Sequence, residues 1–383
     1  MRRVLQKIWN VFRKGDLILL LLCVVASAFG CLCIASSTNH HETIRYVVVQ
    51  VAAILLGVIC YVAVSAVDLD FISEHRTVLV LFNIGLLLLL IPFGVDFNSG
   101  NRSWLDIPLL PVSIQPAEIC KITFVLILAS VMSSHQQRIS SPKSVFAMLF
   151  HLLLLVGTNI ALSKDAGVSL IFVFIFIGMA FAGGVSMIWF LLGGGALVAG
   201  APLIWNYIMS ENQRKRFEVL WNPAIDPMGL KERYHSMRSL KSLTGGGLMG
   251  QGLFKGNRTQ IGALPAQHTD YIFSAIGEEM GFIGCLITLL LLLAIIVRIV
   301  QVGSRSQNYL RRMVCFGSAM ALIFQVCSNV GMCIGVTPVI GLTLPFISYG
   351  GSSIVSLFAM LGLVSGVKAR PAPKSHELYV RPY

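Results

Sequence analysis

The segment from residue 264 to residue 279, LPAQHTDYIFSAIGEE, holds the residues whose types and spacing are most suited to chemistry. His268, Asp270, Glu278 and Glu279 fall within about three helical turns of one another, although apolar stretches surround them. An acidic side chain in hydrocarbon costs roughly 2.5 kcal/mol or more, so a cluster of this kind predicts a functional site.

Asp270 permits two interpretations, which are compatible. Thr269 or Asp270 can cap a helix that begins here, because a helix amino terminus favours negative charge. Alternatively, Asp270 is a general base at the membrane surface, kept ionised by the same helix dipole, that takes a proton from an incoming hydroxyl. In that case His268 orients the base or binds phosphate, and Glu278 and Glu279 tune the electrostatic field at Asp270.

A basic segment precedes this cluster. Residues 207–269 form the longest stretch without a membrane span and carry nine Lys and Arg residues. Guanidinium and ammonium groups suit phosphate, so the segment predicts either attraction to anionic headgroups or binding of a pyrophosphate-bearing lipid. The candidates for phosphate binding are Arg214, Arg216, Arg233, Arg238 and Lys255. The glycine-rich run 244–252 lacks the GK[ST] ending of a nucleotide cradle and predicts a flexible loop.

Other polar residues stand where apolar stretches begin. Pro116, Glu118 and Lys121 predict a helix start with either a Glu118–Lys121 ion pair or a substrate contact. Asp165, in SKDAG, is a further carboxylate on the same side of the membrane, and Ser348 lies in the polar turn of LPFISYGGSSI. Metal binding is weakly indicated, because the pairs 68/70 (DLD) and 40/41 (HH) lack clear partner ligands.

Apolar spans must position all of these residues. The chain has 383 residues, 56% of them hydrophobic and 12% charged, whereas soluble proteins carry about 25% charged residues. We therefore predict an all-α polytopic membrane protein with about ten transmembrane helices in a single domain, residues 1–383. The predicted spans are about 17–36, 46–67, 77–95, 117–133, 146–162, 167–183, 187–206, 270–297, 313–334 and 349–367.

The distribution of positive charge predicts the orientation. If both ends are cytoplasmic, the inside segments hold sixteen Lys and Arg residues and the short outside loops hold three, as the positive-inside rule requires. Residues 1–16 and 368–383 are then cytoplasmic, and 207–269 is a large extracytoplasmic loop between spans seven and eight. The net charge of +12 is thus a topology signal and does not indicate a nucleic-acid groove.

Together these motifs resemble the SEDS family of cell-wall polymerases (RodA/FtsW-like) over roughly residues 15–368. The WLD at 104–106 and the KGNRTQ segment are more similar to RodA members than to FtsW members. The matching pieces are NRSWLDIPLLPVSIQPAEICKI, NPAIDPMG, GGGLMGQGLFKGNRTQIGALPAQHTDYIF, EEMGFIG and GLTLPFISYGGSS.

The resemblance implies a peptidoglycan glycosyltransferase that polymerises lipid II at the outer face of the bacterial cytoplasmic membrane, with inversion at the anomeric carbon. Asp270 would be its essential acid, and Trp104 matches the outside-loop tryptophan of the family. Implied partners are a class B penicillin-binding protein and other elongation-machinery proteins. Lipid II already carries an activated leaving group, so no nucleotide cofactor is needed; a divalent cation stays an open requirement. The substrate-binding candidates are Trp104, Glu118, Lys121, Arg214, Arg216, Arg233, Arg238, Lys255, His268, Glu278, Glu279 and Ser348.

The chain departs from the family pattern at several positions. Ala266 replaces a usual acidic residue, Tyr271 replaces the Phe of HTDF, and Arg238 stands where many members have Gln. Three alternatives remain open: a division or sporulation paralogue with the same chemistry, a lipid II flippase, and a non-catalytic scaffold for a penicillin-binding protein. The charged residues are concentrated on the outer side of the predicted spans. This argues against a flippase, which needs polar residues along a path between the two leaflets.

Overall fold

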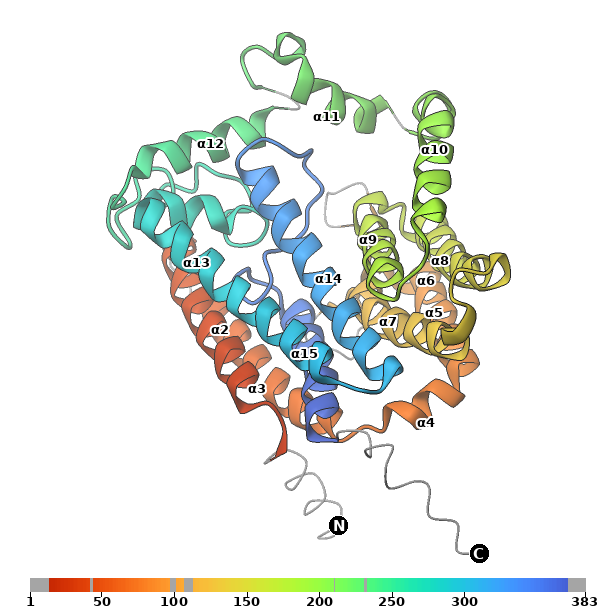
Figure 1. Ribbon diagram of the computed structural model, residues 1–383. Helices are drawn as coiled ribbons and strands as arrows, with labels where there is room; N and C mark the ends of the chain where they lie inside the picture. Colours follow the sequence, from red (N-terminus) through yellow and green to blue (C-terminus); the bar gives the residue numbers. More distant parts are fainter. Residues whose placement is uncertain are drawn as a thin grey trace, which may run out of the picture.

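The computed structural model describes residues 14–41, 44–96, 101–106, 113–209, 211–230 and 233–370. Regular structure in these residues is almost entirely helical (Figure 1). The exception is an antiparallel ribbon in which Val95 of β1 (Gly94–Val95) pairs with Trp104 of β2 (Trp104–Leu105). Residues 97–100 and 107–112, on either side of β2, lie outside the described residues.

Nine helices in the described part of the chain are long and apolar enough to cross a membrane, and a tenth, α9 (Ala166–Ala182), is shorter. These ten helices confirm the predicted spans. The spans are helical because a backbone in hydrocarbon must satisfy its hydrogen bonds within each helix. The nine are α2 (Leu17–Ser37), α3 (Arg45–Ser65), α5 with α6 (Arg76–Leu88, Leu90–Phe93), α7 (Pro116–Ser134), α8 (Pro142–Ser163), α10 with η3 (Met187–Leu203, Ile204–Ile208), α13 (Ile272–Arg305), α14 (Tyr309–Cys333) and α15 (Gly351–Ala369).

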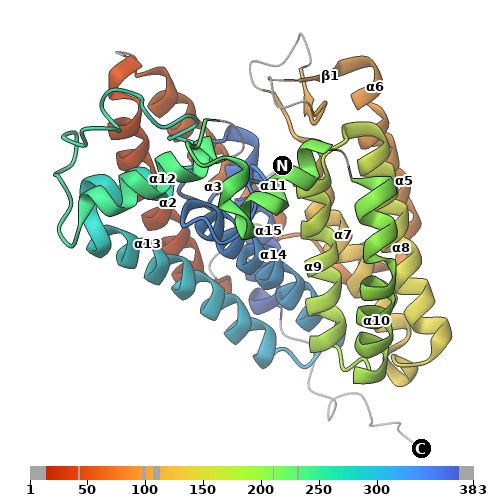
Figure 2. The same cartoon turned by 90° about the horizontal axis from the view of Figure 1, so that it is seen from above.

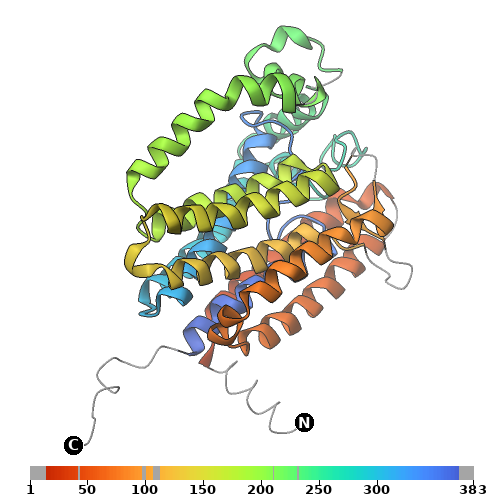
Figure 3. The ribbon, with the colours of Figure 1, turned by 90° about the vertical axis from the view of Figure 1, so that its right-hand side faces the viewer.

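Helices α7, α14 and α15 form the centre of the bundle. In the most apolar 18-residue stretch of each helix, 78% of the residues of α7 and α15 and 67% of those of α14 are buried, whereas none of those of α10 is. Seen from above, α14 and α15 run between a group with α2 and α13 and a group with α5, α8 and α9 (Figure 2). Helix α10 lies at the edge (Figure 3). Small residues allow the tightest contact, because a Cβ at Gly362 of α15 would lie 2.6 Å from the Tyr61 carbonyl oxygen of α3.

The first and last spans meet at one end of the bundle. Asp16 caps α2 by accepting a hydrogen bond from the Leu19 amide, and its buried carboxylate pairs with Arg298 of α13 (2.8 Å) and Lys368 of α15 (3.3 Å). The Tyr61 hydroxyl of α3 donates to the Asp16 carbonyl (2.8 Å). Three helices are therefore joined at the Asp16 carboxylate, and α3 is joined to the backbone carbonyl of the same residue. Which side of the membrane this end faces stays a prediction.

The segment between α10 and α13 folds over the opposite end of the bundle. It contains α11 (Glu211–Trp221), η4 (Pro223–Ile225) and α12 (Tyr234–Gly246). The Ser239 hydroxyl of α12 contacts the Ser274 hydroxyl of α13 and donates to the Cys333 carbonyl (2.7 Å). Helix α12 thus lies across the starting turn of α13 and the last turn of α14. The remaining short elements are η1 (Asn39–His41), α4 (Leu69–Glu74) and η2 (Gln136–Arg138).

Glycines at the end of α12 and just after it allow the backbone to pack closely against α13. A Cβ at Gly246 would lie 1.9 Å from the Gly277 carbonyl oxygen, and one at Gly250 would lie 2.2 Å from the Glu279 carbonyl oxygen. Helix α13 departs from helical geometry at Gly281 (φ 65°, ψ −162°), beside these glycines. The prediction of a flexible loop is therefore wrong for this run, because side chains there would collide with α13.

Candidate active site

The loop that carries Asp270 is held at its backbone from three sides. The side-chain amide of Asn329, in α14, donates to the Asp270 carbonyl (2.8 Å). The Ser348 hydroxyl donates to the Thr269 carbonyl (2.6 Å), and the Tyr349 amide donates to the His268 carbonyl (2.9 Å). The predicted candidate Ser348 thus positions the loop. These bonds fix the Asp270 backbone and leave its carboxylate unused.

The capping interpretation of this loop is wrong. The N-cap of α13 is Tyr271, and it makes no side-chain cap hydrogen bond. Within the described part of the chain, the structure gives the Asp270 carboxylate no hydrogen bond or ion pair. A partly buried carboxylate without a structural partner is available to act on a substrate.

Asp165 is the charged residue that raises the pKa of Asp270. It caps α9 by accepting from the Val168 amide (3.1 Å). A Cβ at Gly167 would contact both Ile340 and the Asp165 carboxylate, and one at Gly341 would lie 3.5 Å from a carboxylate oxygen of Asp270. Residues 340 and 341 therefore lie close to both acids. Sequence reasoning noted Asp165 as an outside carboxylate but did not place it at the site.

The pKa of Asp270 is raised to about 6, first by burial and then by the charge of Asp165. Burial likewise raises the pKa of Asp165. Burial and a like charge therefore oppose the ionised form, although a pKa of about 6 leaves Asp270 mostly ionised at pH 7, as the sequence led us to expect. A carboxylate with a pKa near the working pH is a better general base than an ordinary aspartate, since it takes up a proton more readily and is still mostly ionised at pH 7.

His268 lies in an aromatic cluster beside Asp270. Its ring centroid is 4.9 Å from that of Tyr46 in α3 and 5.7 Å from that of Tyr349. Burial, followed by the neighbouring His41 and His40, lowers the pKa of His268 to about 4. The imidazole is therefore neutral at pH 7. It can donate or accept a hydrogen bond, but it cannot supply a positive charge to a phosphate.

The basic candidates divide into two groups. Arg216 and Arg238 reach toward the Asp270 loop: Arg216 donates to the Val339 carbonyl (3.4 Å), and Arg238 donates to the Ala263 carbonyl. The other three engage their own surroundings. The Arg214 guanidinium donates to the Met209 carbonyl (3.2 Å), the Arg233 amide donates to the Asp226 carboxylate (3.1 Å), and Lys255 is exposed on the glycine-rich loop.

Glu278 and Glu279 are buried, at 0% and 3% exposure, and hold a loop in place. The Glu278 carboxylate accepts from the Arg258 amide (2.6 Å) and the Thr259 hydroxyl (3.0 Å). The Glu279 carboxylate accepts from the Gln260 side chain (2.8 Å) and from Ser36 of α2. Their carboxylate oxygens therefore fasten the KGNRTQ segment to α13 and α2.

The remaining candidates lie on other elements. Glu118 and Lys121, in the first turns of α7, form a buried ion pair at 2.9 Å. The Ser356 hydroxyl of α15 donates to the second Glu118 oxygen (2.8 Å). The pair predicted from the sequence is thus present and is bridged to α15. Trp104 lies in the β1–β2 ribbon.

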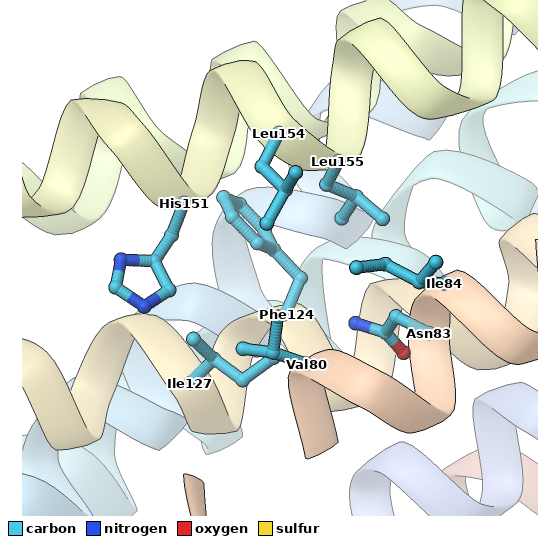
Figure 4. Close-up of a pocket in the computed structure, with 8 residues that line it drawn as sticks. All are labelled: Val80, Asn83, Ile84, Phe124, Ile127, His151, Leu154 and Leu155. Carbon is cyan, nitrogen blue, oxygen red and sulfur yellow. The ribbon is translucent and has the colours of Figure 1, made fainter. Parts of the chain in front are cut away.

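A small cavity between α5, α7 and α8 is separate from these residues (Figure 4). His151 and Asn83 lie at its two ends with apolar side chains between them. It has room for about one water molecule. Among the described residues, no group of three or more His, Cys, Asp or Glu side chains could hold a metal ion. The cavity lining is Val80, Asn83, Ile84, Phe124, Ile127, His151, Leu154 and Leu155.

Curated relatives cover most of this chain. The peptidoglycan glycosyltransferase MrdB of Escherichia coli strain K12 is 31% identical over 320 residues, which are 83% of this chain and 84% of that protein. The probable peptidoglycan glycosyltransferase FtsW of Trichlorobacter lovleyi is 30% identical over 384 residues, 97% of this chain and 98% of that protein. The match thus extends from end to end.

Solved structures have the same fold. One is a chain of a peptidoglycan synthase complex that coordinates polymerization and crosslinking, with a TM-score of 0.78 and 27% identity over 92% of this chain and 97% of that one. Another is the rod shape determining protein RodA of Thermus thermophilus, with a TM-score of 0.68 and 25% identity over 92% and 96%. The model of the FtsW/RodA/SpoVE family, described as cell cycle protein, matches residues 11–371. The chain therefore belongs to the FtsW/RodA/SpoVE family.

Proposed function

We propose that this chain is a peptidoglycan glycosyltransferase that polymerises lipid II into glycan strands, with Asp270 as its general base. The observation that carries the assignment of the base is the Asp270 carboxylate, which is held in place by its backbone and has no partner for its side chain in the described residues. Membership of a family whose relatives are named peptidoglycan glycosyltransferases supports the reaction type.

The reaction needs one proton acceptor. The 4-hydroxyl of an acceptor N-acetylglucosamine attacks the anomeric carbon of a donor N-acetylmuramic acid. As the new C–O bond forms, Asp270 takes the hydroxyl proton. The bond from the anomeric carbon to the pyrophosphate breaks, and undecaprenyl pyrophosphate leaves with the electron pair, which inverts the anomeric centre. General-base catalysis of this kind contributes typically 10²- to 10⁴-fold.

The leaving group carries the negative charge that develops in this reaction. Arg216 and Arg238 are the predicted phosphate-binding residues whose side chains reach toward the Asp270 loop. Guanidinium groups stay charged and present several donors, so they suit a departing pyrophosphate. His268, neutral at pH 7, orients the acceptor sugar or Asp270 by a hydrogen bond.

The location follows from the same geometry. The Asp270 loop lies at the end of α13 opposite to Arg298, which pairs with Asp16 near the chain's two ends. With the charge bias of the loops, this geometry supports a site at the outer face of the bacterial cytoplasmic membrane, with both termini in the cytoplasm. A class B penicillin-binding protein and other elongation-machinery proteins are the proposed partners. A structural relative from a complex that coordinates polymerization and crosslinking supports the first of them.

The test is polymerisation of purified lipid II by the purified chain, with and without a cognate penicillin-binding protein. Asp270→Asn should abolish glycan-chain synthesis while expression and partner binding remain. Asp68→Asn is the matched control, because Asp68 caps α4 near the opposite end of the bundle. Near-normal polymerisation by Asp270→Asn would remove Asp270 as the base. An inactive chain with every partner tested would favour the scaffold alternative.

A further inference from the structure

Two aromatic rings stack beneath α12, next to Asp270. The ring of His235, in α12, is parallel to that of Tyr271 within 7°, at a centroid distance of 5.9 Å. Tyr271 is only 2% exposed. The Tyr271 hydroxyl and the Nδ1 atom of His235 are both buried, and neither has a hydrogen-bond partner in the described part of the chain.

Unpartnered polar atoms in a protein interior are costly, because they lose water and gain nothing in return. A phenylalanine at 271 would fill the same space without this cost, and similar sequences have Phe there. The Tyr271 hydroxyl therefore needs a partner that the described part of the chain does not provide. A tyrosine hydroxyl and a neutral imidazole N–H can both donate to an anionic oxygen.

The surroundings of the two rings are positively charged. Burial lowers the pKa of His235, and so do the charges of Arg216 and Arg238. Arg216 also acts electrostatically on the Tyr271 hydroxyl, which Asp270 influences in the opposite sense. The two rings are therefore close enough to the guanidinium groups of Arg216 and Arg238 and to the Asp270 carboxylate for these charges to act on them.

Three departures from the family pattern meet at this place. Arg238 stands where many members have Gln, and its guanidinium lies 4.3 Å above the ring of Tyr234, the residue before His235. Ala266 replaces an acidic residue, and its carbonyl accepts from the Tyr271 amide (3.2 Å). These contacts bring a guanidinium group and an unpartnered hydroxyl to one place, which favours an anion.

We propose that His235 and Tyr271, together with Arg216 and Arg238, form the subsite that binds the pyrophosphate of the lipid-linked substrate. The Tyr271 hydroxyl and the His235 N–H each donate to a phosphate oxygen, and the guanidinium groups balance its charge. The proposal rests on the proposed function for the identity of the ligand. It adds two residues outside the basic set and places the leaving group beside the base.

The test measures binding, so it needs no turnover. Undecaprenyl pyrophosphate is titrated into the purified full chain in phosphatidylcholine vesicles, and undecaprenol, which lacks the phosphates, is titrated in parallel. Tyr271→Phe and Arg238→Gln should each weaken undecaprenyl pyrophosphate binding about tenfold, the lower end for hydrogen bonds to a charged group. Both substitutions restore the family's residue, so the fold should be preserved. Lys241→Gln, on the exposed side of α12, is the matched control and should change nothing.

Three results would overturn the subsite. The first is an unchanged affinity of Tyr271→Phe for undecaprenyl pyrophosphate. The second is equal weakening for undecaprenol, which would mean that the pocket binds the prenyl chain. The third is an effect that appears only when phosphatidylglycerol is added, which would identify a lipid headgroup as the ligand. A chain that binds undecaprenyl pyrophosphate as expected but never polymerises lipid II would reject the proposed function and keep the subsite.

Discussion

Removing the charge of Asp165 should move the acid limb of the pH–rate profile to lower pH. Asp270 has a pKa of about 6 instead of 3.8, a rise of about two units, and burial contributes more of that rise than Asp165 does. Asp165→Asn should therefore lower the pKa by at most about one unit, to about 5. The cap of α9 should survive, because asparagine accepts the same hydrogen bond from the Val168 amide.

The effect on the rate depends strongly on pH. At pH 5 the ionised fraction of Asp270 should rise from about 10% to about 50%, so polymerisation should become up to about fivefold faster. At pH 7 the ionised fraction is already about 90%, so the rate should change little or fall slightly, because a carboxylate with a lower pKa is a weaker base.

The assay is the initial rate of lipid II polymerisation between pH 4.5 and pH 8, at saturating substrate, for the native chain, Asp165→Asn and the control Asp68→Asn. The control should reproduce the native profile, since Asp68 lies at the other end of the bundle. An acid limb that stays in place, or moves to higher pH, would refute the coupling of the two carboxylates. Loss of all activity at every pH would instead indicate that Asp165 contacts the substrate.

Two further predictions concern the scaffold. Asp16→Ala should lower the free energy of unfolding by about 3 kcal/mol, because it leaves the largely buried guanidinium group of Arg298 unpaired. Asp70→Ala, which breaks a half-exposed ion pair, should cost less than about 1 kcal/mol in the same thermal unfolding assay in detergent. Gly250→Ala should reduce both polymerisation and thermal stability, since its Cβ would lie 2.2 Å from the Glu279 carbonyl oxygen at a φ of +77°. Gly245→Ala meets only a flexible side chain and should behave like the native chain; equal losses for the two glycine variants would contradict the packing argument.

The sequence by itself was sufficient for the membrane helices, and it singled out Asp270 as the residue that we propose as the base. Each span had to be an apolar helix of sufficient length, because hydrocarbon offers no partner for backbone polar groups. Asp270 was identifiable because a carboxylate at the boundary of an apolar span is costly without a function. The Glu118–Lys121 pair was also predictable, since residues three apart on a helix are neighbours.

Contacts between distant parts of the chain were decided only by the tertiary structure. The approach of Asp165 to Asp270 depends on how α9 packs beside the 340–341 backbone, and no local pattern encodes that distance. The capping prediction failed for a related reason, because the loop is held by Asn329 and Ser348 and the helix begins one residue later. The sequence analysis expected Glu278 and Glu279 to bind substrate or to tune the electrostatic field at Asp270, but in the structure their carboxylates bind a loop. Helix propensity and hydrophobic period act locally, whereas desolvation, charge coupling and hydrogen-bond partners depend on the folded neighbourhood.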